Sequence, residues 1–193
     1  MKPVNLKQVL SIFGLLLGCH AFAASQPPNI VLFLVDDMGW QDTSVPFHSE
    51  RTPFNDHFRT PNMERLAKQG VKFTQAYAAA VCSPTRTSIM TGQNPIRHQV
   101  TNWTLNKDGE TSGKTARLQA PVNWKRNGLQ PDAITLPKLL QGAGYYTIHA
   151  GKAHWGAHDT PGSNPKNLGF DANIAGHAAG GPGGWYGKTN FGN

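Results

Sequence analysis

Residues 29–35, NIVLFLV, form a short continuous apolar run that is rich in β-branched side chains. Such a run is typical of a strand that is buried on both faces, as in a parallel sheet. Two further strands are predicted over residues 71–77, where apolar and polar side chains alternate, and over residues 145–150. Because helical segments separate these strands, the sequence predicts an α/β fold with a mostly parallel sheet flanked by helices.

Helix-end signals predict three helices. Residues 60–70 open with Thr, Pro and an early Glu, as an N-cap and first turn do, and they close with a glycine. Residues 83–91 follow a cysteine and end before Gly92. A third helix is predicted within residues 134–144, with Thr135 as its N-cap.

The polar remainder is predicted as loops. Residues 41–59 contain proline and show no periodic pattern, and neither do residues 102–132. We expect the second segment to be a long excursion on the substrate side. Beyond residue 160 the glycine-rich sequence predicts no helix or strand.

Residues 1–23 have the three parts of a secretory signal peptide. Two lysines precede an apolar run over residues 9–18, and residues 21–23 (AFA) offer small side chains for cleavage. We therefore expect export of residues 24–193 to the periplasm or the extracellular space. Cys19 leaves a lipoprotein signal as the alternative. No other apolar run reaches the ~20 residues that a membrane span needs.

Charge and cysteine content narrow the function classes. The sequence has 18 Lys and Arg against 11 Asp and Glu, but the basic residues are scattered, so no nucleic-acid surface is predicted. Cys82 is the one cysteine left after cleavage of the signal, which excludes an internal disulfide. In an oxidising compartment such a cysteine is buried, paired between chains or chemically used.

Asp36 and Asp37 directly follow the first predicted strand. Ligand sites in open α/β sheets lie at the carboxyl ends of strands, and paired carboxylates suit a hard divalent cation. The pair is therefore a candidate metal site, with a solvated loop start or a helix cap as the alternative.

Residues 82–86, CSPTR, place a cysteine at the start of a predicted helix. Backbone N–H groups and the positive end of the helix favour anions there. Arg86, one turn later, adds a planar group that suits tetrahedral oxyanions. A small buried side chain beside a solvated arginine is the alternative interpretation.

Lys152 and His154 follow the third predicted strand, and in an extended segment two residues apart they point the same way. They would supply a cation and a proton-transfer group, unless they are ordinary surface residues. Since each candidate group follows a predicted strand, we expect one cleft to collect a metal site, an anion site and an acid or base.

Three stretches, NIVLFLVDDMGW, TPNMERLAKQGVKFTQAYAAAVCSPTRTSIMTG and GYYTIHAGKAHWG, resemble the N-terminal part of type I sulfatases. These are arylsulfatase-like, formylglycine-dependent enzymes of the alkaline-phosphatase superfamily. The string C-x-P-x-R followed by T-G is their signature, and the resemblance covers residues 27–100 and 134–156. It implies an alkaline-phosphatase-like fold and a sulfuric ester hydrolase that releases inorganic sulfate.

The resemblance also implies the site. A maturation enzyme would oxidise Cys82 to Cα-formylglycine, whose hydrate is the nucleophile and a metal ligand. Asp36 and Asp37 would bind the metal, with calcium favoured over magnesium. Arg86 would hold the hydrate, Lys152 would contact the sulfate, and His154 would hydrogen-bond the second hydroxyl. One hydrate oxygen would attack sulfur and release the alcohol, and proton loss from the other hydroxyl would then expel sulfate.

The family completes this site with a later His, a second pair of metal ligands and a Lys. Asp171, Asn173 and His177 lie too early and lack the matching context. Residues 24–193 are therefore expected to be the front portion of a catalytic domain, with doubtful activity on their own.

Two other functions remain open at this stage. One is a phosphoryl or phosphonate hydrolase of the same superfamily, against which Cys82 argues because such enzymes normally use Thr or Ser. The other is a non-catalytic secreted fragment that keeps the motif. On the sulfatase interpretation the expected partners are a sulfated small molecule or carbohydrate and the maturation enzyme.

Overall fold

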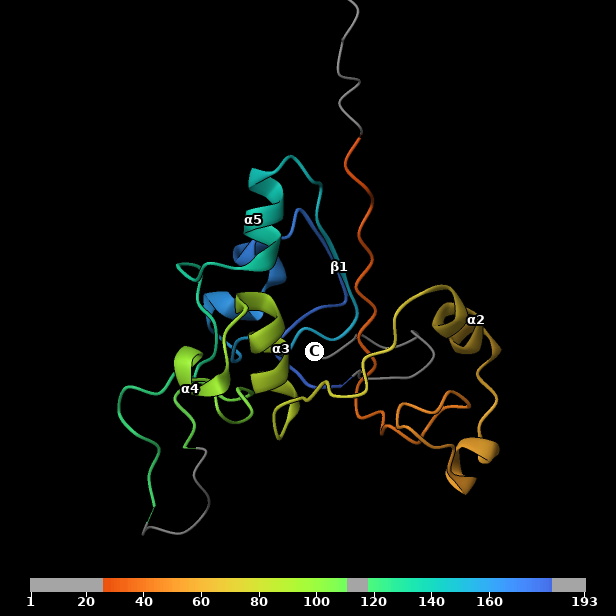
Figure 1. The fold of residues 1–193 in the computed structure, drawn as a ribbon. Helices are drawn as coiled ribbons and strands as arrows, with labels where there is room; N and C mark the ends of the chain where they lie inside the picture. The colour runs from red at the N-terminus through yellow and green to blue at the C-terminus, as the bar shows by residue number, and fades with distance from the viewer. Residues whose placement is uncertain (1–25, 111–117, 182–193) are drawn as a thin grey trace, which may run out of the picture. The chain divides into compact units, whose positions relative to one another are not determined.

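The computed structural model describes residues 26–110 and 118–181 of the 193-residue chain (Figure 1). The chain forms two structural units, Met1–Val35 and Asp36–Asn193. The predicted signal peptide, residues 1–23, lies outside the described residues. In the first unit, residues 26–35 form neither helix nor strand, and the apolar side chains from Ile30 to Val35 are exposed.

Two of the three predicted strands are wrong. Residues 29–35 and 71–77 are not strands, and large apolar side chains in both segments are exposed. A strand exists only where a neighbouring backbone satisfies its N–H and C=O groups, and no described strand pairs with either segment. The third prediction is confirmed in its second half, as strand β1 (Ile148–Ala150).

The sheet of the described residues has two parallel strands, β1 and β2 (Ala172–Ile174), with His149 opposite Asn173. The crossover between them contains two short 3₁₀ helices, η2 (Pro161–Ser163) and η3 (Pro165–Leu168). Neither β2 nor these turns was predicted, because three or four residues are too few for a periodic pattern. The parallel pairing agrees with the predicted α/β class.

All three predicted helices are confirmed. They are α2 (Pro61–Gln69), α3 (Cys82–Thr91) and α5 (Leu136–Gly142), preceded by the N-cap residues Thr60, Val81 and Thr135. Helix α3 begins one residue earlier than predicted and ends at Gly92, whose φ of 66° is left-handed. The short α4 (Pro95–His98) was not predicted. No helix in the described ranges is long and apolar enough to cross a membrane.

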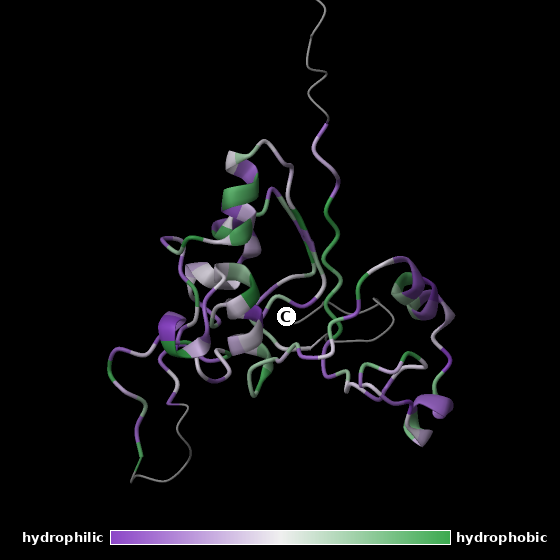
Figure 2. Cartoon of the chain, in the orientation of Figure 1, coloured by the Kyte–Doolittle hydropathy of each residue, from purple (hydrophilic) through white to green (hydrophobic). Residues whose placement is uncertain are grey.

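A small core holds α3 against the crossover. Met90 of α3 packs with Leu129, Trp155 and Leu168, and the Trp155 ring stacks on Phe170 with centroids 5.6 Å apart. Leu66 of α2 and Leu139 of α5 remain exposed. Figure 2 shows apolar (green) and polar (purple) residues side by side on both helices. The buried contacts therefore concentrate around α3 and β1.

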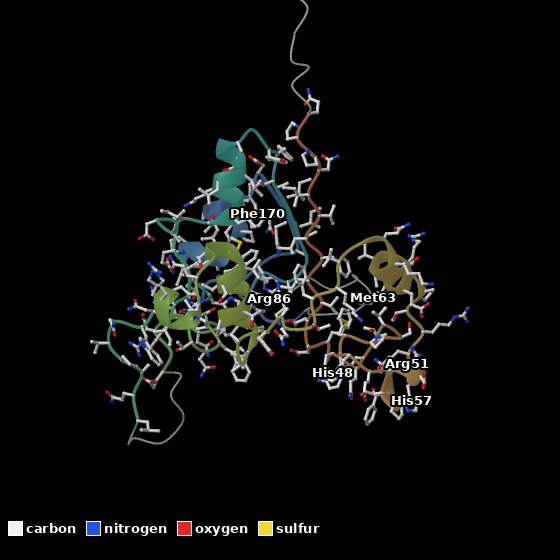
Figure 3. The ribbon with its side chains drawn as sticks, in the orientation of Figure 1. His48, Arg51, His57, Met63, Arg86 and Phe170 are labelled. Carbon is white, nitrogen blue, oxygen red and sulfur yellow. The ribbon has the colours of Figure 1, made fainter. Side chains whose placement is uncertain are left out.

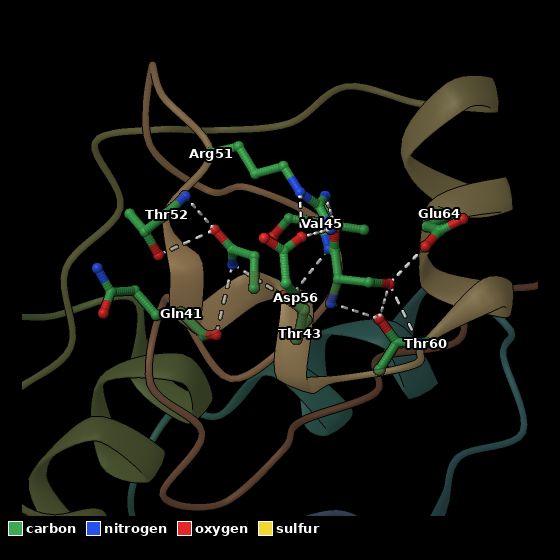
Figure 4. A network of polar contacts seen from close by, with 10 residues as sticks. Gln41, Thr43, Val45, Arg51, Thr52, Asp56, Thr60 and Glu64 are labelled. Carbon is green, nitrogen blue, oxygen red and sulfur yellow. Dashed lines mark hydrogen bonds and ion pairs between the residues drawn. The ribbon is translucent and has the colours of Figure 1, made fainter.

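Residues 41–64, predicted as loop up to residue 59, are held by polar contacts (Figure 4). Asn55, in the 3₁₀ helix η1 (Pro53–His57), is fully buried and donates to the carbonyl oxygen of Thr43 over 2.8 Å. Ser44 donates from Oγ to Glu64 of α2 over 2.5 Å. This segment is ordered by hydrogen bonds, which leave no periodic signal in the sequence.

Candidate active site

A cleft of about 690 Å³ collects the residues that the sequence singled out. Its lining includes Asp36, Asp37, Cys82, Lys152 and His154. The remaining predicted residue, Arg86, is buried in α3 and contacts Asp36 and Lys152. The structure thus brings together three segments that are far apart in the sequence.

Cys82 is the first residue of α3, and its thiol forms no disulfide with any described residue. Thr85 fixes the approach to the helix: its Oγ1 accepts from the Ala79 N–H over 3.0 Å and lies 3.1 Å from the Val81 carbonyl oxygen. The side chain of residue 82 is half-buried. It therefore reaches the cleft beside the N–H groups of the first helical turn.

Arg86 joins the three segments (Figure 3). Its Nη1 donates to the Lys152 carbonyl oxygen over 2.6 Å, and its Nη2 donates to Asp36 Oδ1 over 3.2 Å. Only 6% of the residue is exposed, and its Nε has no partner among the described residues. A buried guanidinium thus lies one turn along α3 from Cys82, with its Nε donor unused among the described residues.

Asp36 accepts hydrogen bonds at both carboxylate oxygens. Lys152 donates from Nζ to Oδ2 over 2.5 Å, opposite the bond from Arg86. Partial burial raises the pKa of Asp36, but the hydrogen bonds and charges of Lys152 and Arg86 outweigh it and leave the pKa below its usual value. Asp36 is therefore ionised at neutral pH.

His154 lies at the base of the cleft in a left-handed backbone conformation, with φ of 57°. The residue is 4% exposed, and neither ring nitrogen has a hydrogen-bond partner among the described residues. Burial, followed by the charges of Lys152 and Arg86, lowers the pKa of His154 to about 4. The imidazole is therefore neutral at pH 7 and able to accept or donate one hydrogen bond.

The donor chemistry of the cleft suits part of a coordination shell for a hard cation. Asp36 and Asp37 offer carboxylate oxygens, the ligand type that calcium prefers. However, both oxygens of Asp36 accept from cations, and the described residues contain no group of three or more His, Cys, Asp or Glu side chains placed for a metal. A metal at Asp36 would therefore share its carboxylate with Lys152 and Arg86.

Sequence reasoning missed His149, which supports the site from β1. Its Nε2 lies 3.3 Å from the Lys152 carbonyl oxygen, and its Nδ1 lies 3.0 Å from Oδ1 of Asn173 on β2. Burial lowers the pKa of His149 although both hydrogen bonds act to raise it. Only the register of β1 against β2, which sets His149 opposite Asn173, would have identified this residue, and β2 was not predicted.

Asp171 and Asn173 were not expected to be metal ligands, and in the structure both have other contacts. Asp171 contacts Thr147, the residue before β1, and Asn173 contacts His149 in β1. Asp171 accepts from the Thr147 backbone N–H over 2.7 Å, and Asn173 Oδ1 contacts His149. Their polar atoms are thus engaged in holding the sheet.

The other wall of the cleft comes from the predicted excursion. Asn102, Trp103 and Leu105 line it. The excursion is fixed to the segment after His154 by backbone hydrogen bonds, from Leu129 to Trp155 and from His158 to Leu105. It therefore lies on the cleft, where a substrate would pass.

Comparison with known proteins gives a consistent result. The sulfatase family model matches residues 28–181. A sulfatase of Schizosaccharomyces pombe is 36% identical over 79% of this chain, and the mouse N-acetylgalactosamine-6-sulfatase is 35% identical over 94% of it. The crystal structure of Ps i-CgsB in complex with k-i-k-neocarrahexaose is 32% identical over 76% of this chain, with a TM-score of 0.53.

The chain spans only part of the length of these proteins: 25% and 29% of the two relatives and 27% of the crystallised chain. Within that span the match includes the cleft residues from Asp36 to His154. The expectation drawn from the CSPTR string is confirmed: the chain belongs to the sulfatase family.

Proposed function

We propose that this chain acts in the hydrolysis of sulfate esters to an alcohol and inorganic sulfate, with residue 82 supplying the nucleophile. The observation that carries the proposal is the convergence of Cys82, Lys152 and His154 on one cleft, with Arg86 behind it. A nucleophile, fixed positive charge and a neutral proton-transfer group are the parts that such a reaction needs.

Cys82 would first be converted by a maturation enzyme to Cα-formylglycine. The hydrated aldehyde supplies one hydroxyl to attack sulfur and a second hydroxyl whose proton is lost when sulfate is expelled. The position of residue 82 at the start of α3 supports this role, since the first-turn N–H groups favour the developing negative charge.

Lys152, which lines the cleft, would contact the sulfuryl group and stabilise its negative charge, while the buried Arg86 would hold the hydrate. Both cations are paired with Asp36 in the present structure. His154, neutral and without a partner among the described residues, would hydrogen-bond the second hydroxyl and take its proton.

Asp36, Asp37 and residue 82 would hold a divalent cation, with calcium favoured by the oxygen donors. When bound, such an ion supplies Lewis-acid polarisation of a sulfate oxygen. A cation on Asp36 would compete with the bond from Lys152, and loss of that bond would free Lys152 to contact the substrate.

We further propose a sulfated carbohydrate as the substrate class and export of residues 24–193, after removal of residues 1–23, as the setting. Support for the substrate comes from the relative named for N-acetylgalactosamine-6-sulfate hydrolysis and from the solved complex with a neocarrahexaose. The N-terminal sequence supports export.

The test is co-expression of this chain with a formylglycine-generating enzyme, followed by mass spectrometry of the peptide that contains residue 82. We expect an aldehyde that reacts with hydrazide. Because the chain spans only 25% and 29% of the two relatives, we expect any calcium-dependent release of sulfate from an aryl sulfate to be slow, and Cys82→Ala should abolish it. A thiol alone at residue 82 contradicts the proposal. Faster hydrolysis of an aryl phosphate or phosphonate favours that class instead.

A further inference from the structure

The segment that follows β2 covers the imidazole of His154. Residues 176–180, GHAAG, form this segment, the strap, which comes after a left-handed turn at Ala175. The backbone N–H of His154 donates to the carbonyl oxygen of His177 over 3.1 Å. At the other end of the strap, Gly180 lines the cleft together with His154. The strap therefore contacts the residue that is proposed to take a proton, and the proposed reaction does not yet use it.

Gly180 lies against the ring too closely for a side chain. A Cβ at this position would lie 2.9 Å from Cε1 of His154, 3.0 Å from Nδ1 and 3.6 Å from Nε2. The backbone of Gly180 is not in the left-handed region, so its conformation would accept any residue. It is therefore the approach to the imidazole that requires glycine here.

The strap is anchored at its start and folded in its middle. Asn173 of β2 accepts from the Gly176 N–H over 3.1 Å and donates to the Gly176 carbonyl oxygen over 2.8 Å. The side chain of His177 accepts at Nδ1 from the Ala179 N–H over 2.9 Å, and Ala178 between them is fully buried. Because His177 fixes the backbone just before Gly180, its side chain determines where the strap meets the ring.

The imidazole under the strap is cut off from water. Both ring nitrogens of His154 are buried and have no hydrogen-bond partner among the described residues. Burial is the largest cause of the low pKa of His154; Lys152, Arg86 and His177 lower it further, and Asp36 raises it. A buried nitrogen without a partner has lost the hydrogen bonds of water, so the first donor that reaches it is bound strongly. The arrangement keeps the ring available to a hydroxyl donor inside the cleft.

We propose that the strap positions His154 for proton transfer: Gly180 holds the imidazole in place and excludes water from its nitrogens, and His177 keeps the strap folded. Gly180 and His177 are positioning residues, because they act through His154. Their role rests on the proposed function, in which His154 hydrogen-bonds a hydroxyl of the hydrated aldehyde and takes its proton. Exclusion of water leaves that hydroxyl without a competitor for the ring nitrogen.

The experiment measures access to the ring at neutral pH and needs no turnover. Diethyl pyrocarbonate acylates neutral imidazole nitrogens that solvent reaches, and mass spectrometry gives the rate for each histidine-containing peptide of the 193-residue chain. We expect His154 to react at least about tenfold more slowly than the exposed His57. Gly180→Ala should raise the His154 rate about tenfold, because the added methyl group displaces the ring, which is the mobile end of a side chain.

Each substitution has a matched control. Gly181→Ala changes the adjacent glycine, whose Cβ would meet nothing within 4 Å, and should leave the His154 rate unchanged. His177→Ala removes the acceptor for the Ala179 N–H and should raise the His154 rate, whereas His177→Asn keeps an acceptor near the place of Nδ1 and should restore the slow rate. Both variants at residue 177 remove the imidazole, so its charge does not explain a difference between them.

Loss of the whole fold is separated from loss of the strap by His98, which is buried in α4 and should react slowly in every variant. A variant that raises the His98 and His154 rates equally counts against the proposal. The proposal is also overturned if His154 of the wild-type chain reacts as fast as His57, if Gly180→Ala matches Gly181→Ala, or if His177→Ala matches His177→Asn.

This outcome is independent of the chemistry at residue 82. The labelled chain carries an unconverted cysteine, so failure to form the aldehyde would leave the protection of His154 unchanged. Conversely, formation of the aldehyde and release of sulfate would stand even if His154 reacted as fast as His57.

Discussion

The Nη1 of Arg86 donates a hydrogen bond to the backbone carbonyl oxygen of Lys152 over 2.6 Å, although the two residues are 66 positions apart in the sequence. The same carbonyl oxygen lies 3.3 Å from His149 Nε2. A backbone atom is thereby held by donors from α3 and β1, so the position of the Lys152 side chain is tied to the helix that begins at Cys82.

Replacing Arg86 by methionine should break this connection. Arg86→Met keeps an unbranched, flexible side chain but removes both bonds, leaving the Lys152 carbonyl oxygen and the Asp36 carboxylate each without one donor. We expect the free energy of unfolding, measured in urea, to fall by about 1–3 kcal/mol. Arg97→Met on an exposed face should change it by less than about 0.5 kcal/mol. Equal effects of the two substitutions would show that the connection does not stabilise the fold.

The helices and the members of the candidate site could be predicted because their signals are local. Thr135 before α5 and Gly92 after α3 mark helix ends through their own backbone preferences, whatever surrounds them. The CSPTR string likewise carries its chemistry in five adjacent residues. Asp36 and Lys152 each follow a predicted strand in the sequence. In the structure these two residues meet in one cleft.

The strands could not be predicted because a strand is a relation between two segments. Residues 29–35 have stronger strand composition than Ala172–Ile174, yet only the second segment is paired. The role of His149 was invisible for the same reason, since it depends on Asn173 being its neighbour across the sheet. Asp36 was predicted only as a metal ligand. Its hydrogen bonds from Arg86 and Lys152 could not be predicted, because these residues are far from Asp36 in the sequence and meet it only in the folded chain.

Gly162 should be intolerant of any side chain. A Cβ at this position would lie 1.7 Å from the Leu129 carbonyl oxygen, a backbone atom that cannot move without displacing the bond from Leu129 to Trp155. We expect Gly162→Ala to lower the melting temperature by an amount equivalent to about 2–3 kcal/mol or more. Gly142→Ala, at the end of α5 with nothing within 4 Å of its Cβ, should be neutral or stabilising. A Gly162→Ala protein as stable as Gly142→Ala would rule out this close approach.

We predict that Asp37 is a calcium ligand and that its removal weakens calcium binding. Its side chain lines the cleft beside Asp36, and its loss removes one charged ligand of the proposed site. In calorimetric titrations of the matured chain with calcium, we expect Asp37→Ala to weaken binding at least about tenfold, because affinity follows the number of charged ligands. Glu50→Ala removes an exposed carboxylate outside the cleft and should leave calcium affinity unchanged. Wild-type affinity in Asp37→Ala would remove Asp37 from the metal site.

His154 should make the stability of this chain depend on pH below neutrality. Its pKa is about 4 in the folded chain against the usual 6.5, so between these values the unfolded chain binds a proton that the folded chain does not. The contribution of the neutral His154 to stability should therefore be fully present above about pH 7. The free energy of unfolding should fall as pH decreases from 6.5 toward 4, by up to about 3 kcal/mol. Other buried histidines contribute to the same window, so the informative quantity is the difference between wild type and His154→Gln. That variant should show a shallower decline over pH 4–6.5, and the wild-type imidazole should titrate by NMR with a midpoint near 4. A midpoint near 6.5, or parallel stability curves for the two proteins, would mean that the ring is solvated rather than buried without a partner at the base of the cleft.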